Sequence, residues 1–287
     1  MRHWAHQLEA KSLHCGVQVA PVDGTSEYRR ADFEFFIPDM VSTAVALLFT
    51  LVLVVGVPIL SYLTARNPEV ARMPRLAIFI SAVFSQWLLA AIALGVAYLA
   101  APKVFAQGFA ALPWSATLEW GGGIAAVALL ALGVVVVCER CGWMPPEAEM
   151  VYLLMPETAR EKIWGALILA PTAAFCEEFL YRGFLLTQLH GWLHSLVWAW
   201  IVTSVAFGLA HFYQGWNGMT RAGLLGALLA YPVARWGSLY PSMLAHWLID
   251  SVALMWIGPW MARQDRPPVA GNPPTPYAPP SETGSSL

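Results

Sequence analysis

Long apolar runs, rather than alternating apolar and polar positions, occupy most of the chain. A membrane-spanning helix needs about 20 consecutive apolar residues. The runs that meet or approach this length cover 40–63, 76–102, 120–138, 163–189, 193–216, 222–236 and 241–260. The pattern predicts an all-α fold, a polytopic membrane bundle of about seven transmembrane helices.

The composition supports a lipid environment and excludes one class of partner. Hydrophobic residues make up 58% of the 287 and charged residues only 12%, whereas soluble domains carry about a quarter charged residues. A net charge of -2 offers no basic surface for nucleic acid. We therefore expect a multi-pass integral membrane protein whose partner is the bilayer and not nucleic acid.

Polar segments divide the chain into four parts. Residues 1–39 are polar and lack the apolar core of a cleavable signal peptide. Residues 40–162 hold the first three spans, and 163–260 form a second helical part. Residues 261–287 are rich in proline and predict a disordered tail.

The loops suggest an orientation, because Lys and Arg favour the cytoplasmic side. Loops 64–75 and 139–162 each hold three Lys or Arg residues, whereas 101–119 contains only Lys103. With seven spans, this places the N-terminus outside and the tail inside. Arg29 and Arg30 favour the opposite orientation.

The cysteines do not indicate a disulfide scaffold. Cys138 and Cys141 form one C-E-R-C spacing where an apolar run ends. A zinc site would need two further ligands. We interpret the pair as structural or incidental thiols.

The run 163–189 differs from the others because it contains ionisable residues. Each such group costs about 2.5 kcal/mol or more within a span, so it faces the bundle interior and usually serves function. Glu178 lies four residues before Arg182, the spacing of a helical ion pair. This pairing leaves Glu177 to accept a proton.

Two histidines in the following runs have patterned neighbours. His211 comes four residues after Phe207, and His246 comes four residues before Asp250. The spacing places each pair on one helical face. Straight antiparallel spans would nevertheless set Glu177, His211 and His246 at different depths. Convergence then requires the fifth helix to continue through 212–216 and the sixth to tilt.

Three segments together resemble a known family. E-E-F-L-Y-R at 177–182, F-G-L-A-H at 207–211 and H-W-L-I-D at 246–250 are similar to the EExxxR, FxxxH and HxxxN/D motifs of the CAAX protease and bacteriocin-processing (CPBP, or Abi) family. The resemblance covers about 163–257. It implies an intramembrane endopeptidase of the glutamate type that needs no cofactor and cleaves a protein or peptide near its terminus.

The resemblance also implies roles for individual residues. Glu177 and His211 take the positions that activate a water, and His246 and Asp250 those that stabilise the oxyanion. Supporting positions fall to Glu178, Arg182 and Phe207. Asp250 stands where eukaryotic prenyl-protein proteases have Asn, so it must be protonated to donate, or else orient His246. We expect a membrane-associated substrate, and a location in the inner (cytoplasmic) membrane of a bacterium.

Other residues bear on helix shape around this cluster. Pro171 could kink the fourth span and open a cavity beside Glu177. The four glycines Gly183, Gly208, Gly223 and Gly226 would permit close helix approach.

Three alternatives to the glutamate mechanism stay open. Glu177, His211 and His246 could hold zinc with one position open for water. Cys176 as a nucleophile is less favoured, because two adjacent carboxylates disfavour a thiolate. The third alternative is a non-catalytic membrane scaffold, immunity factor or carrier.

Overall fold

The fold is helical throughout the part of the chain that the structure, a computed structural model, describes. That part comprises residues 40–100, 108–144 and 148–265, and its regular elements are all helices. The all-α prediction is confirmed. The polar segment 1–39 and the tail beyond residue 265 lie outside the described residues, although α14 (Gly258–Asp265) extends past the predicted start of the tail.

Four described helices are long and apolar enough to cross a membrane. They are Met40–Arg66, which includes η2 (Val52–Gly56) and α2 (Val57–Arg66), then α4 (Arg75–Ala100), α6 (Trp114–Arg140) and the continuous helix Ala159–Leu193. The pair α11 (Leu196–Ala210) and η5–α12 (Phe212–Trp236) makes a fifth if it counts as one span. The predicted number of seven is therefore not confirmed.

The predicted boundary between the fifth and sixth runs is wrong. α11 ends at Ala210, a 3-10 turn follows as η5 (Phe212–Gln214), and α12 (Gly215–Trp236) begins before residue 222. The ring of His211 explains the break, since its Nδ1 donates to the Phe207 carbonyl at 2.8 Å. That carbonyl would otherwise accept the His211 N–H in an α-helix. Gly215 completes the turn with φ of 74°.

The helix Ala159–Leu193 alternates between α and π geometry. Its parts are α8 (Ala159–Trp164), η3 (Gly165–Leu169), α9 (Ala170–Glu178), η4 (Phe179–Leu185) and α10 (Leu186–Leu193). Pro171 is the second residue of α9, and the helix continues through it. η4 begins directly after Glu178, and all its residues are buried. π turns often occur at functional sites because they redirect the side chains that follow.

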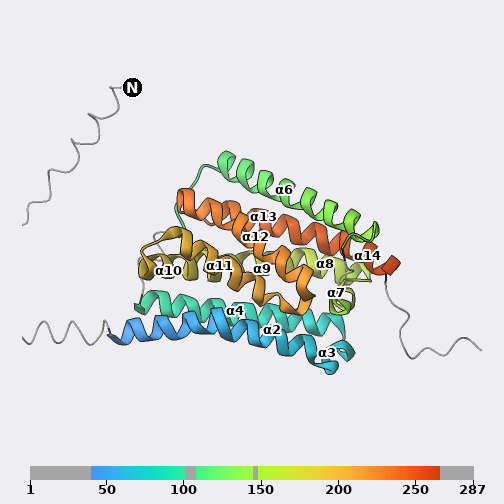
Figure 1. The fold of residues 1–287 in the computed structure, drawn as a ribbon, viewed down its shortest axis with the longest axis horizontal. Coiled ribbons are helices and arrows are strands. Elements are labelled where there is room, and N and C mark those ends of the chain that lie inside the picture. The colour runs from blue at the N-terminus through green and yellow to red at the C-terminus, as the bar shows by residue number, and fades with distance from the viewer. Residues whose placement is uncertain (1–39, 101–107, 145–147, 266–287) are drawn as a thin grey trace, which may run out of the picture. The chain divides into compact units, whose positions relative to one another are not determined.

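The helices lie alongside one another in Figure 1, with α2 and α4 at one edge and α6 and α13 (Tyr240–Val252) at the other. α9, α11 and α12 lie between these edges, where α9 contacts both α4 and α13, and α11 packs on α12. η6 (Ala253–Ile257) carries α13 into α14. The helix Ala159–Leu193 thus occupies the middle of the bundle.

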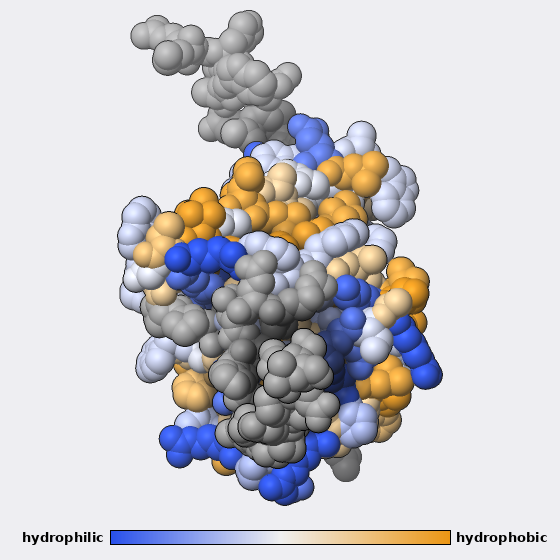
Figure 2. Space-filling model, turned by 90° about the vertical axis from the view of Figure 1, so that its right-hand side faces the viewer, coloured by the Kyte–Doolittle hydropathy of each residue, from blue (hydrophilic) through white to orange (hydrophobic). Residues whose placement is uncertain are grey.

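The two loops that each hold three Lys or Arg residues lie at one end of the bundle. Arg75 donates to both carboxylate oxygens of Glu157 at 2.8 Å and 2.8 Å, and to the Leu153 carbonyl at 2.8 Å. These bonds join the start of α4 to the last turn of α7 (Glu149–Leu154) and to the segment that follows it. Figure 2 faces this end, where hydrophilic residues surround the helix ends. The shared side agrees with the distribution of Lys and Arg that gave the predicted orientation.

Glycine allows the inner helices to approach closely. A Cβ at Gly208 would lie 2.8 Å from the Met219 carbonyl oxygen and 3.1 Å from Gly223 Cα. One at Gly226 would lie 3.0 Å from Arg182 Nη2 and 3.0 Å from Phe207 Cδ1. The predicted packing role of these glycines is confirmed, and Gly183 likewise packs against Leu239.

We expect Gly208→Ala to destabilise the protein by about 1–3 kcal/mol, because the backbone of α12 must move to admit a methyl group. The matched control is Gly133→Ala in α6, where a Cβ meets nothing within 4 Å. Melting temperatures of the purified variants in one detergent measure the difference. Equal melting temperatures would contradict the packing role of Gly208.

Candidate active site

Glu177 lies where three inner elements meet. It stands in the last turn of α9, and its Oε2 is 3.9 Å from His211 Nε2 and 3.9 Å from His246 Nε2. This oxygen is buried and accepts no hydrogen bond from the described residues. Oε1 accepts a 2.7 Å hydrogen bond from Gln86 Nε2 on α4. The two oxygens of one carboxylate therefore have different surroundings.

His211 presents one particular nitrogen to Glu177. Its Nδ1 contacts the Phe207 carbonyl, which can only accept, so Nδ1 carries a proton. In the neutral ring, Nε2 is then an acceptor, and Nε2 is the nitrogen that faces Glu177. His211 lies near Glu177 although α11 ends at Ala210, so convergence does not require the fifth helix to continue through 212–216.

His246 lies among three carboxylates. Its Nδ1 is 2.8 Å from Glu178 Oε1, and its Nε2 is 3.4 Å from Asp250 Oδ2. Glu177 completes the set through the 3.9 Å contact with Nε2. The His246 side chain is only 4% exposed, so these contacts dominate its surroundings. Asp250, one helical turn later, reaches the same nitrogen that faces Glu177.

Glu178 and Arg182 form an ion pair with no exposure to solvent. Arg182 Nη1 donates to Glu178 Oε1 at 2.8 Å, and each side chain is 0% exposed. The same oxygen accepts from His246, so one buried carboxylate links α9, η4 and α13. The i,i+4 contact expected from the sequence is present, while its contribution to stability stays a prediction.

Phe207 packs at the centre of these charged groups. The Arg182 guanidinium lies 4.2 Å above its ring, a cation–π geometry. The rings of His211 and His246 lie 4.7 Å and 6.2 Å from it. The first residue of the FxxxH segment thereby supports both histidines.

Sequence analysis missed Gln86. A signal was available, because this amide interrupts the apolar run that became α4, and polar groups in membrane helices usually bond across helices. Ser81 and Ser85, its polar neighbours, bond carbonyls of their own helix. Gln86 instead reaches α9 and contacts Glu177.

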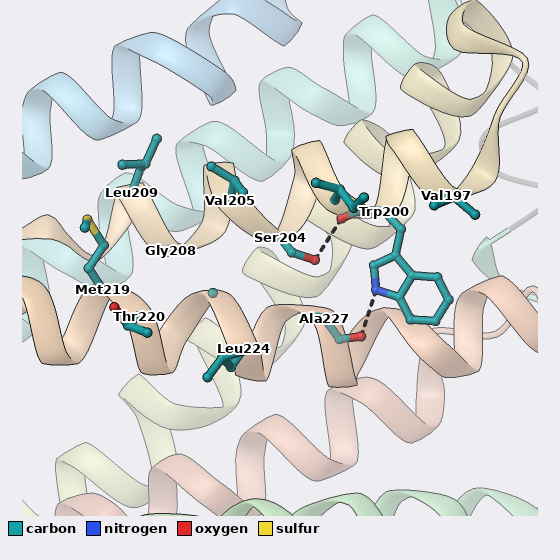
Figure 3. A pocket seen from close by; sticks show the side chains of 12 residues that line it. Val197, Trp200, Ser204, Val205, Gly208, Leu209, Met219, Thr220, Leu224 and Ala227 are labelled. Atoms are coloured by element: carbon teal, nitrogen blue, oxygen red, sulfur yellow. Dashed lines mark hydrogen bonds between the residues drawn. The ribbon is translucent and has the colours of Figure 1, made fainter.

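An apolar pocket of about 550 Å³ lies between α11 and α12, outside the Glu177 cluster (Figure 3). Trp200 Nε1 donates to the Ala227 carbonyl and Ser204 Oγ to the Trp200 carbonyl, so these lining groups already have partners. The other lining residues are Val197, Ile201, Val205, Gly208, Leu209, Met219, Thr220, Gly223 and Leu224. The pocket offers hydrocarbon contact and no chemistry.

Within the described ranges, no group of three or more His, Cys, Asp or Glu side chains is placed to hold a metal ion. Cys138, Cys141 and Cys176 are free thiols there, and Cys176 is buried. The cavity expected beside Pro171 stays a prediction.

A comparison with protein families identifies the segment that holds this cluster. Residues 159–252 match the family model described as type II CAAX prenyl endopeptidase, Rce1-like. This segment is Rce1-like. The resemblance predicted from three motifs is thereby confirmed, and it suggests a CAAX-type intramembrane protease with a peptide or protein substrate. No curated protein and no solved structure matches the chain. Gln86 lies outside the Rce1-like segment.

We expect Arg182→Ala to cost about 3–5 kcal/mol, because it leaves the Glu178 carboxylate buried without its cation. The double change Glu178→Gln/Arg182→Met should cost much less, since it removes both charges and the Gln carbonyl still accepts from His246. Melting temperature and expression yield measure both variants. A stable but inactive Arg182→Ala protein would show instead that Arg182 serves the reaction directly.

Proposed function

We propose that the protein is an intramembrane endopeptidase that hydrolyses a peptide bond with a water activated by Glu177 and His211. The observation that carries this proposal is the convergence of Glu177 Oε2 with His211 Nε2 and His246 Nε2 at 3.9 Å each. These groups come from separate helices in a bundle whose outer helices are apolar enough to span a membrane. Ionisable side chains inside a membrane bundle are energetically costly, so a cluster of them usually serves function.

The first step is proton transfer from the water. Glu177 Oε2 and His211 Nε2 are both acceptors, and a water at about 2.8 Å from each would direct its two protons to them. One lone pair then faces the substrate carbonyl. As the O–C bond forms, Glu177 accepts the proton, and it later gives this proton to the departing amine as the C–N bond breaks.

His246 serves the developing oxyanion. Glu178 holds Nδ1, so a protonated ring presents Nε2–H to the region in front of Glu177. A donor placed there stabilises negative charge on the carbonyl oxygen. Asp250 contacts Nε2 from the side at 3.4 Å, and we assign it to orienting His246 because an ionised carboxylate cannot itself donate.

The substrate is a membrane-associated protein or peptide that is cleaved near its terminus. The family description is that of a CAAX prenyl endopeptidase, so a farnesylated C-a-a-X peptide is the first probe we propose. The proposed location is the inner membrane of a bacterium. Mass spectrometry of membrane-protein termini, with and without the chain, would identify the natural substrate.

We expect Glu177→Gln and His211→Ala each to lower kcat by about 10²–10⁴, because each removes a group that activates water. The assay uses internally quenched peptides with a farnesylated C-a-a-X end, next to unfarnesylated twins, and purified protein in liposomes. His190→Ala, an exposed histidine outside the cluster, is the control. If a monodisperse Glu177→Gln protein turned over normally, the polar cluster would have a structural role only, and the proposal would be wrong.

Activity should also survive chelators, because no step above needs a Lewis acid. The test is the same assay after prolonged treatment with EDTA and 1,10-phenanthroline, together with elemental analysis. Zinc would activate water by lowering its pKa to about 7. A stoichiometric metal whose removal stops cleavage, and whose return restores it, would make Glu177, His211 and His246 ligands instead.

A further inference from the structure

We propose that Gln86 is a positioning residue that holds the Glu177 carboxylate in its reactive orientation, an inference that rests on the proposed function. Gln86 belongs to α4, before the Rce1-like segment begins at residue 159. No sequence motif links it to the cluster. Its place is visible only in the folded bundle.

The two oxygens of the Glu177 carboxylate differ in their hydrogen bonding. Gln86 Nε2 donates to Oε1 at 2.7 Å, and this is the short end of the range for such a bond. Oε2 is left without a hydrogen bond and faces both histidines. Without the amide, the plane of the carboxylate could rotate about the last side-chain bond, and neither oxygen would stay directed at the histidines.

The amide can hold Glu177 before and after proton transfer. An ionised carboxylate only accepts, and Nε2 supplies the donor. After Oε2 gains a proton, Oε1 is the carbonyl oxygen of the neutral acid and still accepts from the same Nε2. The hydrogen bond from Gln86 therefore fits both protonation states of Glu177.

Trp87, the next residue, fixes the register of α4 on α9. Its Nε1 donates to Thr172 Oγ1 at 3.3 Å, and its ring stacks on Phe175 at 5.4 Å. Neither contact involves Glu177. Trp87 therefore provides a control in the same helix interface that separates packing from positioning.

The test is a comparison of Gln86→Met with Trp87→Phe. A hydrogen bond to a charged group is worth about 1.5–3 kcal/mol, so its loss should lower kcat about 10- to 100-fold. We expect Gln86→Met to show this fall with KM nearly unchanged, and Trp87→Phe to keep kcat within about twofold. Gln86→Asn, which keeps an amide on a shorter arm, should recover part of the loss. The probe is the quenched farnesylated C-a-a-X peptide.

The parallel variant Glu177→Gln separates the two proposals. If Glu177→Gln is inactive while Gln86→Met and Gln86→Asn both turn over normally, positioning by Gln86 is wrong and the protease proposal stands. If Glu177→Gln turns over normally, the protease proposal fails.

An infrared readout is independent of turnover. The carboxyl band that is lost in Glu177→Gln should shift in Gln86→Met and stay in place in Trp87→Phe. If the band does not move in Gln86→Met, the inference is wrong whatever the activity of that variant. If Gln86→Met does not fold, the band is measured in Gln86→Asn instead.

Discussion

The buried carboxylate of Glu178 is the group on which the rest of the cluster depends. A charge without solvent contact needs both a counter-charge and hydrogen bonds, and Glu178 finds Arg182 and His246 at 2.8 Å each. Satisfying this one carboxylate fixes α13 against α9. Phe207, stacked under the guanidinium, then fixes α11 as well. Moving α13 or α11 away would cost the buried pair its hydrogen bond with His246 or its contact with the Phe207 ring.

Two adjacent glutamates acquire different tasks from this constraint. Successive side chains on a helix point about 100° apart, so when Glu178 faces the buried pair, Glu177 must face elsewhere. It faces Gln86 on one side and the two histidines on the other. Each carboxylate has one buried oxygen without a hydrogen bond from the described residues. That oxygen of Glu177 faces the two histidines, whereas Glu178 uses its other oxygen to accept from both Arg182 and His246. In the proposed reaction, this difference makes Glu178 the supporting carboxylate and Glu177 the reactive one.

The sequence predicted what depends on local spacing. Apolar length identified four spans, i,i+4 spacing identified the Glu178–Arg182 contact, and three motifs identified the Rce1-like segment. It did not predict the end of α11, because that break depends on the His211 ring competing for a backbone carbonyl. Nor did it predict Gln86, since residues about ninety positions apart meet only through helix packing. The predicted number of seven spans is not confirmed for a related reason: apolar length cannot distinguish one span from a pair of helices joined by a turn.

In the proposed reaction, Glu177 activates a water and does not attack the peptide itself. A single-turnover cleavage in H₂¹⁸O, followed by mass spectrometry of the product and of the protein peptide containing Glu177, tests it most directly. Attack by an activated water places ¹⁸O in the new carboxyl terminus and none in Glu177. Label in the Glu177 side chain would mean that its carboxylate formed an acyl intermediate, which would contradict the account.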